Sequence, residues 1–174
     1  MLGIYENFPQ NIHNIADFEF SVSVKRLQQT LVRTIYNLNN QSINLEDITL
    51  PSIPNCTVVF ELGIAADNGF SFLDNEERDK LLKTIRRRPF QTLDFLCAIR
   101  YNKTEQQKRI RLKFDYYILR FKFAAQLLQM QICHERGPMH VSHKDLPELF
   151  ASKINGDFTK KMLKPINTGQ YASN

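Results

Sequence analysis

The sequence contains no tryptophan, only six glycines and only three cysteines in 174 residues. With so few glycines, the backbone offers few places where a phosphate group could approach it closely. The cysteines, Cys56, Cys97 and Cys133, are an odd number at wide spacing. A disulfide framework is therefore not expected, and a reducing, cytoplasmic compartment fits better. No apolar run approaches the roughly 20 residues of a membrane span, and the first residues do not resemble a secretory signal, so no membrane association is expected.

The sequence motifs of several enzyme classes are also missing. There is no G-x-x-x-x-G-K-S/T loop, no G-x-G-x-x-G after a strand, no G-x-S-x-G elbow and no H-E-x-x-H. These patterns mark phosphate loops, dinucleotide sites, nucleophile elbows and zinc proteases. We therefore expect no cofactor and no catalytic residues. A metal-dependent hydrolase is kept as a third alternative, with Glu61, Asp94 and His134 as its candidate residues.

Charge is distributed unevenly along the chain. The formal net charge is +5, but residues 1–75 carry three basic and eight acidic residues, whereas residues 76–174 carry twenty basic and ten acidic ones. A basic half of this kind is typical of a region that binds anions, although a solvated surface that maintains solubility gives the same composition.

Hydrophobic periodicity alternates between that of strands and that of helices. Leu27, Leu31 and Ile35 recur at helical spacing after Ser23, which can cap a helix start. Asp74 begins a second helix with capping-box-like spacing. The expected order is strand, helix, strand, helix, three strands and helix, with strands at 17–24, 57–64, 93–101, 109–123 and 128–132 and helices from 24, from 74 and at 144–154.

This order predicts an α+β fold in a single domain that spans residues 1–154. Consecutive strands towards the C-terminus favour an antiparallel or mixed sheet of about five strands, with helices packed on one face. The other face would be open to solvent or to a partner. Residues 155–174 have little periodicity, and we expect a polar tail that is mobile or loosely docked.

The most informative segment is the stretch 109–123, RIRLKFDYYILRFKF. Basic and apolar residues alternate there with a period of two, which is typical of a strand with one cationic face. The alternation shifts near 115–117, because Arg109 and Arg111 are at odd positions and Arg120 is at an even one. A β-bulge at 115–117 would unite the cations on one face. Without it, they would be divided between the two faces of the sheet.

A cationic sheet face suits nucleic acid or an acidic protein surface. For base stacking we expect Tyr117 and Tyr101 to be exposed, whereas the phenylalanines of the stretch belong to the core. The alternative is a solvated face with cross-strand ion pairs to Asp94 and Glu61. The cations that end the second helix also offset its dipole, which explains part of their clustering without a ligand. The candidate nucleic-acid-binding residues are Arg86, Arg87, Arg88, Arg109, Arg111, Lys113, Tyr117, Arg120 and Lys122.

Three of the four histidines lie within ten residues of one another, beside Cys133. Their spacing matches no zinc signature, so we expect no metal and instead a surface loop that gains charge below about pH 6.5. Loops carried by a rigid scaffold often hold binding residues. The candidates in this loop are His134, Glu135, Arg136, His140 and His143.

These observations favour a small intracellular, non-enzymatic binding module. Its cationic sheet face would contact nucleic acid or a nucleoprotein assembly, with affinity that falls as salt rises. The first alternative is a protein-interaction subunit that associates through a sheet edge, either with itself or with another chain.

Overall fold

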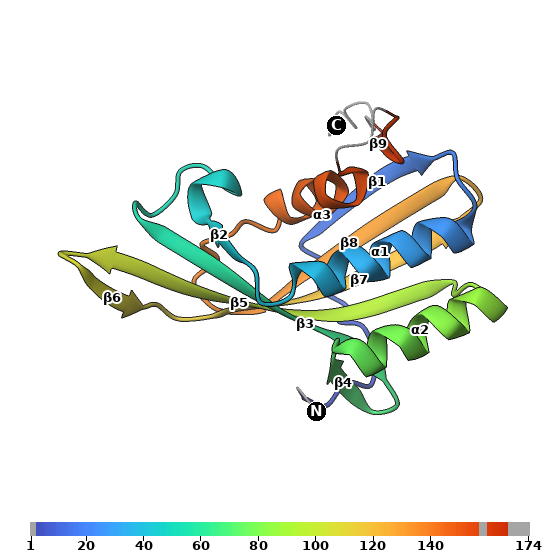
Figure 1. Ribbon diagram of the computed structural model, residues 1–174, viewed down its shortest axis with the longest axis horizontal. Helices are drawn as coiled ribbons and strands as arrows, with labels where there is room; N and C mark the ends of the chain where they lie inside the picture. Colours follow the sequence, from blue (N-terminus) through green and yellow to red (C-terminus); the bar gives the residue numbers. More distant parts are fainter. Residues whose placement is uncertain (1–2, 157–159, 167–174) are drawn as a thin grey trace.

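The computed structural model describes residues 3–156 and 160–166, which form an α+β fold (Figure 1). The described strands form one sheet in the order β2-β3-β5-β7-β8-β1-β9, with β4 and β6 pairing with β3 and β5. Every pairing between strands is antiparallel. The strands are β1 (Asn14–Phe20), β2 (Ser42–Asn44), β3 (Cys56–Ala66), β4 (Gly69–Phe72), β5 (Thr92–Glu105), β6 (Lys108–Arg111), β7 (Asp115–Ala124), β8 (Leu127–Arg136) and β9 (Leu163–Pro165).

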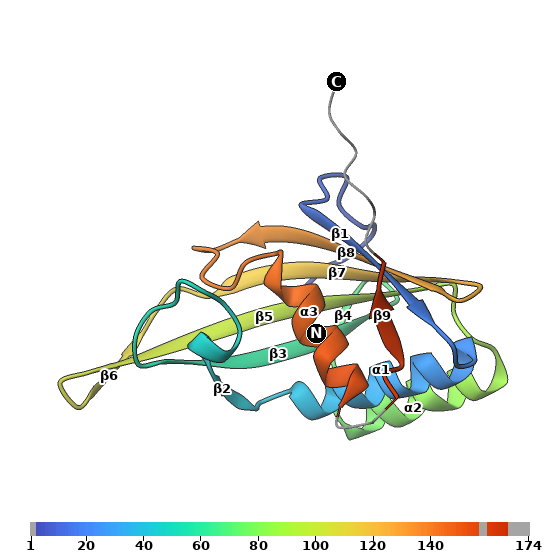
Figure 2. The same cartoon turned by 90° about the horizontal axis from the view of Figure 1, so that it is seen from above.

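The α-helices α1 (Val24–Leu38), α2 (Asn75–Arg87) and α3 (Asp145–Asn155) lie along one side of the sheet (Figure 2). A short 3-10 helix, Leu45–Asp47, follows β2. The first two α-helices start where the sequence predicts. The Ser23 hydroxyl accepts a hydrogen bond from the Arg26 N–H, and the Asp74 carboxylate accepts one from the Glu77 N–H, which satisfies donors that a helix start leaves free.

Helices α1 and α2 lie side by side and run in opposite directions. At one end, the side-chain amide of Gln28 donates to the Phe90 carbonyl at 2.7 Å and accepts from the Phe90 N–H at 2.9 Å. At the other end, the Arg78 guanidinium lies 4.3 Å from the centre of the Tyr36 ring. Gln28 is fully buried, so both hydrogen bonds are shielded from water. The start of α1 is thus fixed beside the end of α2.

The core lies between the sheet and the helices. On β5, alternate residues such as Phe95 and Ile99 point into it, as the period of two requires. The opposite face, called here the outer face, is partly covered. Tyr5 and Phe8 of the N-terminal segment pack there against a small apolar cluster that includes Ile118. The outer face is therefore less open than the sequence analysis predicts.

The α+β class and the three helices are confirmed, but the prediction of five strands and their order is wrong. Strands β2, β4 and β9 have only three or four residues, too few to establish a period. Stretch 109–123 is divided between β6 and β7. Within the predicted tail, β9 pairs with β1, whereas residues 157–159 and 167–174 lie outside the described part. None of the described helices is both long and apolar enough to cross a membrane.

Candidate nucleic-acid interface

An extra residue between β6 and β7 brings four of the five cations of stretch 109–123 to one face. Arg111 pairs with Asn102 and Asp115 pairs with Ile99, so three residues, 112–114, stand opposite only two on β5. One residue is therefore in excess, as in a β-bulge, and the side chains after it alternate in the opposite phase from those before it. The expected bulge exists, but its extra residue lies at 112–114, before residues 115–117. A second register shift lies between Tyr116 and Tyr117 in the pairing of β7 with β8, and there the extra residue belongs to β8.

Cross-strand partners show which face the cations occupy. Arg109 and Arg111 pair with Thr104 and Asn102, and Arg120 and Lys122 pair with Asp94 and Thr92. These partners are the even-numbered residues of β5, which alternate with the core positions and so point to the outer face. The four cations therefore share the outer face.

The shared face is nevertheless long, and its cations do not converge on one spot. Thr104 and Asp94, the partners of Arg109 and Arg120, are separated by about 33 Å of extended strand. Arg120 is also engaged, because its Nε and Nη2 each donate to the Asp94 carboxylate at 2.8 Å and its guanidinium lies 4.7 Å from the Phe8 ring centre. Arg120 thus forms the kind of cross-strand ion pair considered as the alternative.

A group of aromatic and basic side chains lies where β7 begins and β8 ends. The rings of Phe114 and Tyr116 stack with centroids 6.1 Å apart and planes 30° apart. The Arg136 guanidinium lies 4.1 Å from the Tyr116 ring centre, a cation–π contact. Together with Lys113, these residues line an open hollow of about 420 Å³ beside Gly137. We call Lys113, Phe114, Tyr116 and Arg136 the platform.

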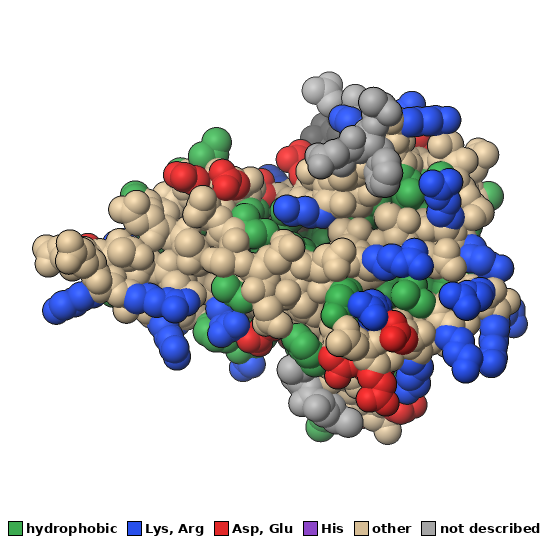
Figure 3. Space-filling view, viewed as in Figure 1, with side chains coloured by type: hydrophobic (Ala, Val, Ile, Leu, Met, Phe, Trp, Pro, Cys, Tyr) green, Lys and Arg blue, Asp and Glu red, His purple; other side chains and the backbone are tan. Residues whose placement is uncertain are grey.

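Basic residues of β6 extend the cationic surface beyond the platform. All four residues of β6 are exposed, including Arg109 and Arg111. Basic side chains gather over this projecting hairpin (Figure 3). The platform and β6 therefore combine stacking surfaces with cations that no ion pair within the described part of the chain engages.

The prediction that Tyr117 and Tyr101 are exposed is wrong. Tyr117 is 0% exposed and Tyr101 is 1% exposed. The Tyr117 hydroxyl donates to the Val141 carbonyl, and the Tyr101 hydroxyl donates to the Asp115 carboxylate. The odd-numbered β7 positions face the helices, so Tyr117 belongs to the core and its neighbour Tyr116 points to the outer face.

Directly beneath the platform lies a buried carboxylate, that of Asp115, which is 0% exposed. Its Oδ1 atom is 2.9 Å from His134 Nε2 and 2.6 Å from the Met139 N–H. Its Oδ2 atom accepts from the Tyr101 hydroxyl and from the His140 N–H, the latter at 2.9 Å. Four donors thus surround a carboxylate that would otherwise be costly to bury. We call this group the Asp115 network, and it ties the loop 137–141 to β5, β7 and β8.

The two buried tyrosines of this region stay protonated. Burial raises the pKa of Tyr101, and the hydrogen bond to Asp115 raises it further. Burial and the nearby Asp115 carboxylate likewise raise the pKa of Tyr117. Both hydroxyls can therefore donate at neutral pH. The Tyr101 hydroxyl also accepts from the Val141 N–H at 3.0 Å, so the tyrosines help to fasten the loop.

A fourth histidine, His13, joins two of the histidines noted in the sequence. Its ring centroid is 6.4 Å from that of His134 and 6.1 Å from that of His143, and its Nδ1 accepts from the His134 main-chain N–H. His140 packs instead edge-on against Tyr101. Within the described part of the chain, no three His, Cys, Asp or Glu side chains are placed to share a metal ion.

The histidine cluster predicts a loss of stability in acid. Burial lowers the pKa of His143, and nearby His13, Lys144 and His134 lower it further, against an opposing effect of Asp145. The unfolded chain then binds more protons than the folded one below about pH 6.5, so the free energy of unfolding should fall between about pH 7 and pH 5. Urea denaturation across this range measures it. His143→Gln should flatten the profile, and an unchanged profile in this variant would contradict the assignment.

The remaining candidates from the sequence lie elsewhere. Arg86, Arg87 and Arg88 are exposed at the end of α2, on the helix side of the sheet. Lys122 is exposed at the far end of β7, and Glu135 is the extra residue of β8 in its pairing with β7. The structure therefore brings Lys113 and Arg136 together at the platform. Arg111 and Arg109 lie successively farther from it along β5 in one direction, and Arg120 and Lys122 in the other.

The hydrolase candidates are not brought together. Glu61 and Asp94 lie on the outer face, where each pairs with an arginine, Arg100 and Arg120 respectively. His134 points to the helix side, towards Asp115. The thiols also offer no reactive group, since all three cysteines are buried and burial raises the pKa of Cys133 to about 11.

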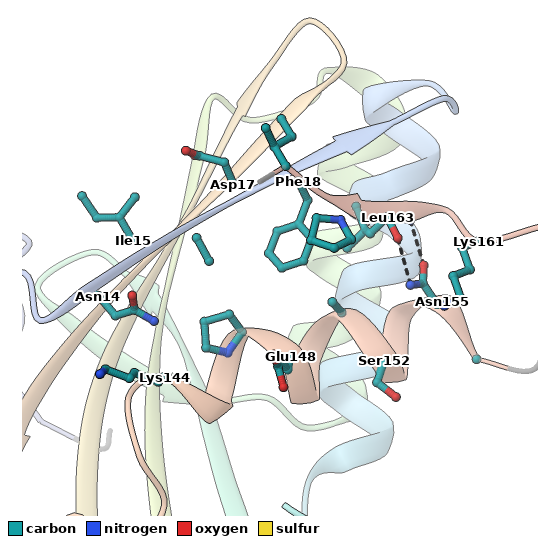
Figure 4. Close-up of a pocket in the computed structure, with 16 residues that line it drawn as sticks. Asn14, Ile15, Asp17, Phe18, Lys144, Glu148, Ser152, Asn155, Lys161 and Leu163 are labelled. Atoms are coloured by element: carbon teal, nitrogen blue, oxygen red, sulfur yellow. Dashed lines mark hydrogen bonds between the residues drawn. The ribbon is translucent and has the colours of Figure 1, made fainter. Parts of the chain in front are cut away.

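A second hollow, of about 510 Å³, lies between α3 and β1 (Figure 4). Phe18 is directed into it, whereas Ile15 and Asp17 point away from α3. The Asn155 side chain is fully engaged, donating to the Leu163 carbonyl and accepting from the Leu163 N–H. None of the candidate residues from the sequence lines this hollow.

The prediction that the phenylalanines of the stretch belong to the core is wrong for Phe114, which is half-buried and lies outside both core clusters. Sequence reasoning also missed Tyr116, His13 and the role of Asp115. One signal was present, because Asp115 is the only acidic residue in a stretch that otherwise alternates cations with apolar residues. His13 gave no signal, since 121 residues separate it from its partner His134. Comparison with protein-family models, with curated proteins and with solved structures gave no match.

Proposed function

We propose that this protein binds single-stranded nucleic acid through the platform and β6. The observation that carries the proposal is the stacked pair Phe114–Tyr116 with Arg136 over Tyr116, bordered by basic residues. Proteins that bind single strands combine aromatic rings or guanidinium planes, on which bases stack, with cations that follow the backbone. A base would stack on Phe114 or on the Arg136 guanidinium, and Arg109, Arg111 and Lys113 would contact phosphates.

The Asp115 network supports this role, because it holds the platform from below. Phe114 and Tyr116 flank Asp115 in the sequence. Gly137, which follows Arg136, lies against the Asp115 side chain. A platform on a fixed backbone loses little conformational freedom when a strand binds.

Fluorescence anisotropy with a labelled oligothymidylate tests the proposal. Tyr116→Ala removes the ring against which both stacking surfaces, Phe114 and the Arg136 guanidinium, are held. It should weaken binding by roughly 5- to 150-fold, the effect of losing about 1–3 kcal/mol of stacking on one base. The double variant Arg109→Gln/Arg111→Gln should lower the slope of log affinity against log salt by about 1.4, since each phosphate contact to a single strand contributes about 0.7.

Lys122→Gln is the matched control, because it removes an exposed cation from the same face at the far end of β7. It should change affinity and salt slope little. Absence of binding at low salt, or equal losses in Lys122→Gln and Arg109→Gln/Arg111→Gln, would overturn the proposal.

A further inference from the structure

A second cationic surface lies at the opposite end of the molecule from β6. Lys25 and Arg26 occupy the first turn of α1, and the C-terminal half of α2 and the residue after it supply the rest. The Gln28–Phe90 hydrogen bonds place these two ends together. Basic side chains gather over this end of the two helices (Figure 3). We call it the helix-end patch: Lys25, Arg26, Lys83, Arg86, Arg87 and Arg88, all exposed.

The helix-end patch is not neutralised within the described residues. None of its six cations forms an ion pair there. The acidic residues of α2 are all in its first half, at 76, 77 and 79, and α1 has none. Arg86 and Arg87 offset the dipole of α2 at its C-terminus, but Lys25 and Arg26 stand at the positive end of α1, where cations are unfavourable. The fold alone therefore does not account for these two residues.

The chemistry of the helix-end patch differs from that of the platform. Four of its six cations are arginines, whose guanidinium groups can grip phosphate oxygens with two hydrogen bonds. The large hydrophobic side chains that are exposed in the described residues lie elsewhere: Ile4, Ile12, Ile15, Leu50, Ile110, Met139 and Ile166. Phe90, beside the patch, is half-buried and packs against the core, unlike Phe114 and Tyr116 of the platform. Among the described residues, the patch thus has cations without a surface for stacking unpaired bases or for entering a membrane.

We propose that the helix-end patch is a second nucleic-acid site, which binds the phosphate backbone of a duplex. A duplex hides its bases in the stack and displays phosphates, so cations alone suffice to bind it. The sheet separates this site from the outer face, and β6 lies at the far end (Figures 1 and 2). The inference does not depend on the platform, and a protein with both sites would hold a duplex and a single strand at once.

Two probes in parallel test the inference: a blunt-ended DNA duplex and the oligothymidylate, each measured by anisotropy. The variant Arg86→Gln/Arg87→Gln/Arg88→Gln should weaken duplex binding at low salt by tenfold or more and lower its salt slope by up to about 2.7, since each duplex phosphate contributes about 0.9. Its affinity for oligothymidylate should stay within about twofold. Tyr116→Ala should weaken oligothymidylate binding and leave duplex binding within about twofold. The two probes therefore distinguish an error in this proposal from an error in the platform proposal.

Two further variants complete the test. Lys25→Gln/Arg26→Gln should also weaken duplex binding, and its thermal melting should show no loss of stability because it removes cations from the positive end of a helix. Lys80→Gln removes an α2 cation that already pairs with Glu77, and it should leave duplex binding unchanged. Duplex binding that survives all these changes overturns the inference. So does an equal loss with both probes, or arginine-dependent capture by phosphatidylserine vesicles without duplex binding.

Discussion

Replacing Asp115 with alanine is expected to lower the free energy of unfolding by about 3–5 kcal/mol, one of the two largest effects expected of a single substitution. The carboxylate accepts four hydrogen bonds in a site with no access to water. Its removal leaves the buried Tyr101 hydroxyl and the partly buried donors of His134, Met139 and His140 without this acceptor. Each donor that stays buried and unpaired costs about 1–3 kcal/mol. Guanidinium denaturation followed by circular dichroism measures the loss.

Two variants show whether the effect comes from the network. Asp115→Asn keeps one acceptor oxygen and turns an amide N–H₂ towards groups that are themselves donors, so it should be less stable than the wild type but more stable than Asp115→Ala. Asp47→Ala removes an exposed carboxylate and should change stability by less than about 0.5 kcal/mol. A loss below about 1 kcal/mol in Asp115→Ala would mean that water or rearrangement satisfies the donors.

Gly137→Ala is expected to destabilise the fold by about 3 kcal/mol or more, which combines backbone strain with overpacking. Gly137 has φ of +115°, a conformation that other residues rarely adopt. An added Cβ would lie 2.3 Å from the Phe114 carbonyl oxygen and 2.7 Å from Asp115 Cα. These are backbone atoms, so the contact cannot be relieved by turning a side chain.

Gly3→Ala is the matched control for this substitution. Gly3 also has a positive φ, +148°, but an added Cβ there would meet nothing within 4 Å. Comparison of the two variants by thermal melting separates strain from collision, and Gly137→Ala should be clearly the less stable. It should also weaken oligothymidylate binding, because Phe114 and Arg136 of the platform adjoin the collision. Equal stability of the two variants would contradict the prediction, because it would mean that the loop 137–141 moves to accommodate the added Cβ at little energetic cost.

Much of the local structure could be predicted from the sequence. The caps Ser23 and Asp74 act within three residues of themselves, so local pattern suffices to place the starts of α1 and α2. The cationic face was also predictable, since alternation fixes which residues of a strand share a side. The need for a bulge followed from the same alternation, but its position at 112–114 depended on pairing with β5.

Alternation alone does not say which face of the sheet the helices cover. The prediction of which aromatic residues are exposed depended on knowing that face. Tyr116 and Tyr117 are adjacent and chemically alike, yet the helices cover the face of Tyr117, whereas Tyr116 points to the outer face as part of the platform. Arg120 shares the cationic face, but Asp94 and the N-terminal Phe8 engage it.

The α+β class, the helix starts and a basic sheet face were predictable because they follow from propensity, capping and period over a few residues. The convergence of four donors on Asp115, the contact of His13 with His134 and the division of the basic residues into two surfaces were not predictable. The reason is that these contacts join segments that chain topology, rather than local pattern, brings together: β1 meets β8 through pairs such as Asn14 with Ile132, and no periodicity encodes a partner that distant.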